Sequence, residues 1–129
     1  MRGLEEVLSE ACAVFSSLRI RYVIVGGVAV NLLGRARSTF DIDAIAAIDK
    51  VSAERLVKAF KQRSFEVSPG DIDEALKEKR HFSIFDSKSV YRFNCKGVYC
   101  VNEKCALSAR RRMRLVGNPV FVDSAEELI

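Results

Sequence analysis

Residues 25–43, VGGVAVNLLGRARSTFDID, gather most of the side chains in this sequence that could do chemistry. Asp41 and Asp43 are separated by one residue, so in a strand both carboxylates project from the same face. Carboxylate oxygens are the ligands that Mg²⁺ prefers, and two of them side by side repel each other without a cation. The pair therefore predicts a magnesium site, with a solvated strand end as the alternative.

Gly26 and Gly27 predict a phosphate site next to these carboxylates. A strand that ends in two glycines and leads into a helix leaves backbone N–H groups unpaired, and no side chain keeps a phosphate away. Arg37 and Thr39 alternate with Asp41 in an extended stretch, so a guanidinium, a hydroxyl and a carboxylate would line one groove. The alternative is a tight turn followed by a solvated loop. The sequence has neither a P-loop motif nor a dinucleotide fingerprint.

The elements that must position these residues can be read from the apolar periodicity. Spacings of three and four predict a helix over 4–18, and similar patterns predict helices that begin at caps Ser52 and Asp71. Apolar runs and alternation predict strands. The strand segments are 21–25, 41–48, 65–67, 81–85 and 90–100, with a strand pair around Gly117-Asn118-Pro119 and a basic helical piece over 105–114.

Helices and strands alternate early in the chain, whereas strands cluster later. This order predicts an α/β (α+β) fold in which helices pack against a mixed β-sheet. A length of 129 residues is that of one domain, so we expect a single domain over 1–129. With 49% apolar and 29% charged residues, the composition excludes a disordered chain.

No apolar run reaches the length of a membrane span, and two glutamates stand where a secretory signal would be apolar. We therefore expect a cytoplasmic protein without a membrane partner. The net charge of +4 is compatible with nucleotides or nucleic acid as partners. The arginines of the run 110–114 could receive an RNA acceptor or a triphosphate tail, and their alternative is a solvated helix face leading into a strand.

The four cysteines do not have the spacing of a zinc site. Three of them follow a C-x4-C-x4-C pattern instead of paired C-x2-C motifs, and the chain has one histidine. We therefore expect reduced, mostly packed thiols at Cys12, Cys95, Cys100 and Cys105.

Taken together, GG at a strand end, a short helix and R-x-T-x-D-I-D on the next strand resemble the nucleotidyltransferase superfamily that includes DNA polymerase β. The resemblance is greatest to its small prokaryotic members, which are often encoded beside toxin–antitoxin systems. It implies a nucleotidyltransferase fold and Mg²⁺-dependent transfer of a nucleoside monophosphate from an NTP, such as ATP, to an acceptor hydroxyl on RNA, protein or a small molecule. The implied roles are phosphate binding by Gly26, Gly27, Arg37 and Thr39, and binding of one or two Mg²⁺ ions by Asp41 and Asp43.

The family normally carries a third acidic residue on a later strand, in an R-x-D pattern. In YRFNCKG, residues 91–97, the matching catalytic position is Asn94. An asparagine offers a neutral carbonyl oxygen but neither the charge nor the proton acceptance of a carboxylate. Two functions therefore stay open, an impaired transferase and a degenerate nucleotide-binding or partner-binding subunit of a two-protein module or homo-oligomer. A third reading is a basic RNA-binding domain without a nucleotide site.

Two further expectations concern the surroundings of this motif. If DSKS, residues 86–89, is a four-residue turn, His81 lies opposite Asn94 on the same sheet face and becomes a neighbour of the site, unless it is simply an exposed strand histidine. Relatives of this type commonly continue with C-terminal helices. Residues 124–129 end where such a helix would begin, so we expect a minimal form, a shortened chain or a part borrowed from another subunit.

Overall fold

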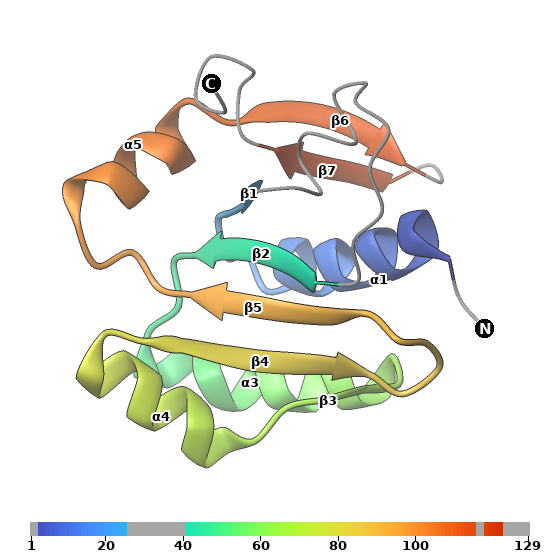
Figure 1. The fold of residues 1–129 in the computed structure, drawn as a ribbon, viewed down its shortest axis with the longest axis horizontal. Helices are drawn as coiled ribbons and strands as arrows, with labels where there is room; N and C mark the ends of the chain where they lie inside the picture. Colours follow the sequence, from blue (N-terminus) through green and yellow to red (C-terminus); the bar gives the residue numbers. More distant parts are fainter. Residues whose placement is uncertain (1–2, 26–40, 116–117, 123–129) are drawn as a thin grey trace.

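A computed structural model of the chain describes residues 3–25, 41–115 and 118–122 (Figure 1). Strands β1 to β7 form one sheet in the order β3-β4-β5-β2-β1-β7-β6, in which the β2–β5 and β1–β7 pairs are parallel and the other pairs antiparallel. The expected mixed sheet with packed helices is therefore confirmed. The elements are α1 (Leu4–Ser17), β1 (Tyr22–Val25), β2 (Asp41–Ala46), α3 (Lys50–Gln62), β3 (Phe65–Glu66), α4 (Pro69–Glu78), β4 (His81–Asp86), β5 (Arg92–Lys96), α5 (Val101–Ser108), β6 (Arg111–Leu115) and β7 (Asn118–Val122).

The main core lies between the sheet and helices α1 and α3, which pass behind it in Figure 1. The expected stripe on α1 is buried, and β2 buries its alternate residues Ile42, Ala44 and Ala46. A chain of aromatic contacts crosses this core, with ring centroids 5.1 to 6.1 Å apart, from Tyr22 through Phe15, Phe60 and Phe65 to Phe93. On the opposite face, α5 covers only the β1 side with a small cluster around Val23 and Leu107. Among the described residues, that face also carries the polar side chains of Asp41 and Asp43 on β2 and of Arg92 and Asn94 on β5.

The predicted helix caps are wrong by three residues in both cases. Asp49, not Ser52, caps α3, because the Asp49 carboxylate accepts from the Ser52 backbone N–H at 2.7 Å and the Ser52 hydroxyl accepts from that of Asp49 at 3.0 Å. Ser68, not Asp71, caps α4, with Pro69 in the first helical position. In each helix a polar residue in the first turn was mistaken for the cap.

The basic helical piece predicted over 105–114 is helical only over 105–108, and the prediction is wrong for its arginines. Helix α5 ends at Ser108, and Arg111 and Arg112 lie in strand β6, which pairs with β7 as the expected hairpin around Asn118. The Arg110 guanidinium donates to the carbonyl oxygen of Leu107 at 3.0 Å, which satisfies a helix-end carbonyl just before the chain becomes extended. The arginines therefore begin an edge strand of the sheet.

None of the helices in the described ranges is long and apolar enough to cross a membrane. The cysteines divide into two pairs, all with free thiols: Cys12 and Cys95 are buried, whereas Cys100 and Cys105 are exposed. The expectation of mostly packed thiols therefore holds for two of the four.

Candidate functional site

Strands β2 and β5 bring four polar side chains together on one face of the sheet. Their parallel register places Asp43 beside Asn94 and Asp41 beside Arg92. The residues between them, such as Ile42 and Phe93, point the other way and are fully buried in the main core. Alternate side chains of each strand therefore point to opposite faces of the sheet. The apolar side chains pack in the main core, and the polar side chains lie on the face away from α1 and α3.

Two contacts join the strands within this cluster. The amide nitrogen of Asn94 donates to the Oδ1 atom of Asp43 across 3.4 Å, and the Nη2 atom of Arg92 lies 3.1 Å from the Oδ1 atom of Asp41. The side chains of Arg92 and Asp41 are 42% and 54% exposed, so this ion pair is screened by water and contributes at most about 1 kcal/mol. Its value is positional, since it holds a carboxylate at the solvent edge of the cluster.

Sequence reasoning missed Arg92 as a member of this cluster. It stands two residues before Asn94, and that spacing alone puts both side chains on one face of β5. The pairing with Asp41 depends on β5 lying next to β2, which the order of elements along the chain does not reveal.

The two carboxylates fit a single hard cation. Mg²⁺ takes one or two protein carboxylates and completes its shell with water and substrate phosphate oxygens. Asn94 could provide a neutral oxygen ligand if its side-chain amide flips by 180°, since Oδ1 would then occupy the present position of Nδ2. Among the described residues no group of three or more His, Cys, Asp or Glu side chains could hold a metal ion. The possible cation ligands among the described residues of this cluster are therefore Asp41, Asp43 and the amide of Asn94.

The predicted phosphate-binding residues Gly26, Gly27, Arg37 and Thr39 lie outside the described residues. Their placement relative to the carboxylates stays a prediction. The described part of the site is thus the part that contains Asp41, Asp43 and Asn94.

His81 is not opposite Asn94, contrary to the expected register. Ser83 occupies that place, and His81 lies opposite Lys96. The hairpin loop is residues 87–90, one residue later than expected, because the Asp86 backbone N–H still pairs with the Tyr91 carbonyl at 3.2 Å. The buried Asp86 carboxylate accepts from the Lys88 backbone N–H and the Ser89 hydroxyl, which stabilises this loop. Moving a loop by one residue moves the register of a hairpin by two.

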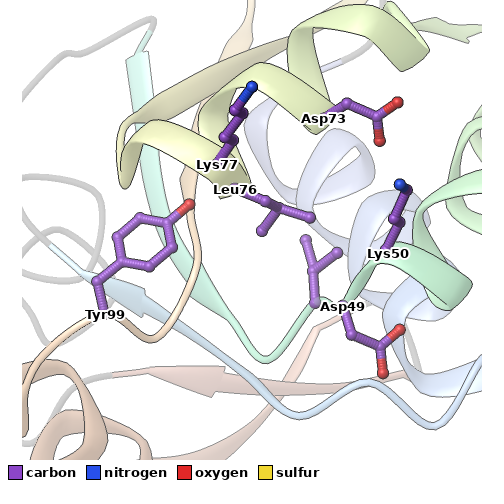
Figure 2. Close-up of a pocket in the computed structure, with 7 residues that line it drawn as sticks. Asp49, Lys50, Asp73, Leu76, Lys77 and Tyr99 are labelled. Atoms are coloured by element: carbon purple, nitrogen blue, oxygen red, sulfur yellow. The ribbon is translucent and has the colours of Figure 1, made fainter.

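A pocket of about 530 Å³ lies apart from the carboxylates, beyond the opposite end of β2 (Figure 2). The start of α3 and the middle of α4 line this pocket. Figure 2 shows Leu76 between Tyr99 on one side and Lys50 on the other. The Tyr99 hydroxyl donates to the carbonyl oxygens of Ala75 and Arg80, each 3.1 Å away, so it secures the end of α4. This pocket contains none of the residues expected to bind nucleotide.

The sequence matches no protein-family model and no curated protein. Solved structures do match. ANT(2'')-Ia, solved in complex with adenylyl-2''-tobramycin, superimposes with a TM-score of 0.64 at 18% identity over 96% of this chain and 71% of that one. An antigenic nucleotidyltransferase-like protein from Paracoccidioides brasiliensis gives a TM-score of 0.67 at 20% identity over 97% and 62%.

A tRNA-processing enzyme gives a TM-score of 0.54 at 17% identity, covering 97% of this chain and 33% of that enzyme. These likenesses extend over nearly the whole chain and show that it has the nucleotidyltransferase fold. The chain spans about a third to about seven tenths of the length of these three structures.

Proposed function

We propose that this chain is a cytoplasmic, Mg²⁺-dependent nucleotidyltransferase that moves a nucleoside monophosphate from an NTP to an acceptor hydroxyl. The observation that carries the proposal is the position of Asp41 and Asp43 on one face of β2, beside Asn94 of β5, in a chain with the nucleotidyltransferase fold. Each feature alone has a structural explanation. Their coincidence on one exposed face supports a phosphoryl-transfer site.

In this proposal Asp41 and Asp43 bind the cation, and Arg92 keeps Asp41 in place. The Asn94 amide donates to Asp43, which orients that carboxylate. When bound, Mg²⁺ offsets the triphosphate charge and makes the acceptor hydroxyl easier to deprotonate. We assign the phosphates to the backbone of Gly26 and Gly27 and to the side chains of Arg37 and Thr39.

The first test measures nucleotide binding by calorimetry. Wild-type protein should bind ATP in the presence of Mg²⁺, and the double variant Asp41→Asn with Asp43→Asn should lose that binding, because its isosteric amides lack the charge that holds the cation. The control is Asp71→Asn with Asp73→Asn, which removes the same charge from exposed positions on α4. Equal affinity in wild type and in the Asp41/Asp43 double variant would refute the site.

One observation favours a second candidate function, a catalytically degenerate subunit that binds nucleotide or a partner protein, as in a toxin–antitoxin-like module. A neutral amide faces Asp43 where the resemblance implies a third carboxylate, so the acceptor hydroxyl has no obvious base. Incubation with labelled NTPs and RNA or protein acceptors separates the two. Label transferred by the wild type supports the enzyme, whereas label transferred only by Asn94→Asp supports the degenerate subunit.

A further inference from the structure

A second, smaller pocket of about 230 Å³ lies where α1 ends and β1 begins, next to the start of β6. Three arginines line it together with two aromatic residues. Its polar and aromatic lining is Ser16, Arg19, Arg21, Tyr22, Arg110 and Phe121, without a carboxylate.

Within the described residues, these three arginines differ from Arg63, Arg80 and Arg92 in having no ion pair. Arg63, Arg80 and Arg92 each form an ion pair with an acidic side chain, whereas Arg19, Arg21 and Arg110 form none with the described residues. Positive charges that line one pocket repel each other unless an anion binds between them. Guanidinium groups suit phosphate best among anions, since their planar forks bind its oxygens in pairs.

The structure holds the side chain of Arg110 in place and brings Arg19 to the pocket through the end of α1. The Arg110 guanidinium lies 4.5 Å from the centre of the Phe121 ring and donates to Leu107, while its Nε atom has no hydrogen-bond partner in the described ranges. Arg19 has a left-handed backbone with φ of 58° just after the end of α1, and its backbone N–H donates to the Ser16 carbonyl at 3.0 Å, so the helix end brings this residue to the pocket.

The dimensions of the pocket indicate what part of a ligand it accepts. Pockets for whole small molecules measure about 300 to 1,000 Å³, so 230 Å³ suits a single phosphate group better than a complete nucleotide. Arg110 already covers a face of Phe121, which leaves that face closed to a stacking base. Arg111 and Arg112 continue the positive charge along exposed positions of β6, as a chain of phosphates would require.

We propose that this arginine pocket, formed by Arg19, Arg21 and Arg110, binds a backbone phosphate of a single-stranded nucleic acid. Its link to catalysis rests on the proposed function, in which that nucleic acid is the acceptor. Arg21 stands four residues before Val25, the strand partner of Asp43, so these two positions are about 13 Å apart along β1.

The test measures fluorescence anisotropy of a labelled ten-nucleotide oligouridylate, without NTP and with EDTA present. Wild type should bind the RNA with an affinity that falls with salt, and Arg19→Gln with Arg21→Gln should bind it about tenfold more weakly. Each lost phosphate contact should lower the slope of log K against log salt by about 0.7. The control Arg63→Gln with Arg80→Gln removes the same charge from ion-paired positions and should bind like the wild type.

Three results would overturn the arginine pocket: no RNA binding by the wild type, equal weakening in the control, or displacement of the RNA by an equal concentration of inorganic phosphate. Because the assay needs neither Mg²⁺ nor NTP, its failure leaves nucleotide binding at Asp41 and Asp43 untouched. Conversely, loss of ATP binding in the Asp41/Asp43 variant with intact RNA binding separates the two sites.

Discussion

The side chain of Asn94 decides the electrostatics of the candidate site. As an amide donor it stabilises the charge of Asp43, so β2 and β5 can lie side by side without a cation between them. A carboxylate in its place would face Asp43 directly and repel it. The amide of Asn94 thus satisfies Asp43 when no cation is bound, but it supplies no carboxylate that could accept a proton.

A substitution at this residue makes that trade measurable. Asn94→Asp should destabilise the protein by about 1 kcal/mol in EDTA, because a hydrogen bond to a charged group is replaced by repulsion. Added Mg²⁺ should raise the melting temperature of the variant more than that of the wild type. Thermal unfolding with and without Mg²⁺ checks both statements, and an equal response of the two proteins would show that residue 94 does not face the cation.

The four cysteines give a second test of individual environments. Burial raises the pKa of the Cys12 and Cys95 thiols to about 12, so the reactive thiolate is almost absent at neutral pH. We expect iodoacetamide to modify Cys100 and Cys105 within the native protein and to spare the buried pair until unfolding. Mass spectrometry of native and urea-treated samples measures this, and early modification of Cys95 would contradict the packing of β5.

Among the elements, the turn from β5 into α5 depends on one buried carboxylate. Glu103 accepts from the backbone N–H groups of Tyr99 and Cys100, at 2.7 and 3.0 Å, and pairs with Lys96. Burial opposes its ionisation, but the hydrogen bonds from Lys96 and Tyr99 outweigh this and lower the pKa of Glu103 below its ordinary value. The hydrogen bond between Lys96 and Glu103 also raises the pKa of Lys96.

This arrangement predicts an acid-sensitive step in stability. A lowered pKa means that Glu103 stabilises the fold above its ordinary pKa of 4.5, and that this contribution is lost as the pH falls through the lower native value. Glu103→Gln should cost about 1 to 3 kcal/mol at pH 7, and the cost should shrink in acid. Urea unfolding at several pH values tests this against the exposed control Glu54→Gln, and a deficit that is constant with pH would contradict it.

The sequence could predict most elements because their signals are local. Helices α1 and α3 and strands β1, β2, β4 and β5 follow from apolar spacing within each segment. The caps and the β4–β5 register could not be predicted, since they depend on which of two nearby polar residues bonds the backbone, as Ser68 and Asp86 do here. For the site, the same face for Asp41 and Asp43 was predictable, whereas the contact with Arg92 required the long-range order of the strands.

In the whole molecule, the candidate site and the main core are two faces of the same strands. Phe93 is fully buried between Arg92 and Asn94 and lies 6.1 Å from Phe65 by ring centroid. Phe93→Ala should therefore cost about 3 to 5 kcal/mol, a large part of the stability of a domain this size. Phe85→Ala on the neighbouring strand, where the side chain is 48% exposed, should cost much less. Denaturant titration compares the two, and similar losses would argue against this division of faces.

The parallel pairing of β2 with β5 also has a consequence for biosynthesis. Asp43 and Asn94 are 51 residues apart. The ribosome therefore delivers the carboxylates of Asp41 and Asp43 well before strand β5, which is to lie beside them. Strand β4 is made in the interval and must leave the place next to β2 open until β5 arrives. The cluster therefore forms as a late event of folding, and a nascent chain that stops before Arg92 should emerge without it.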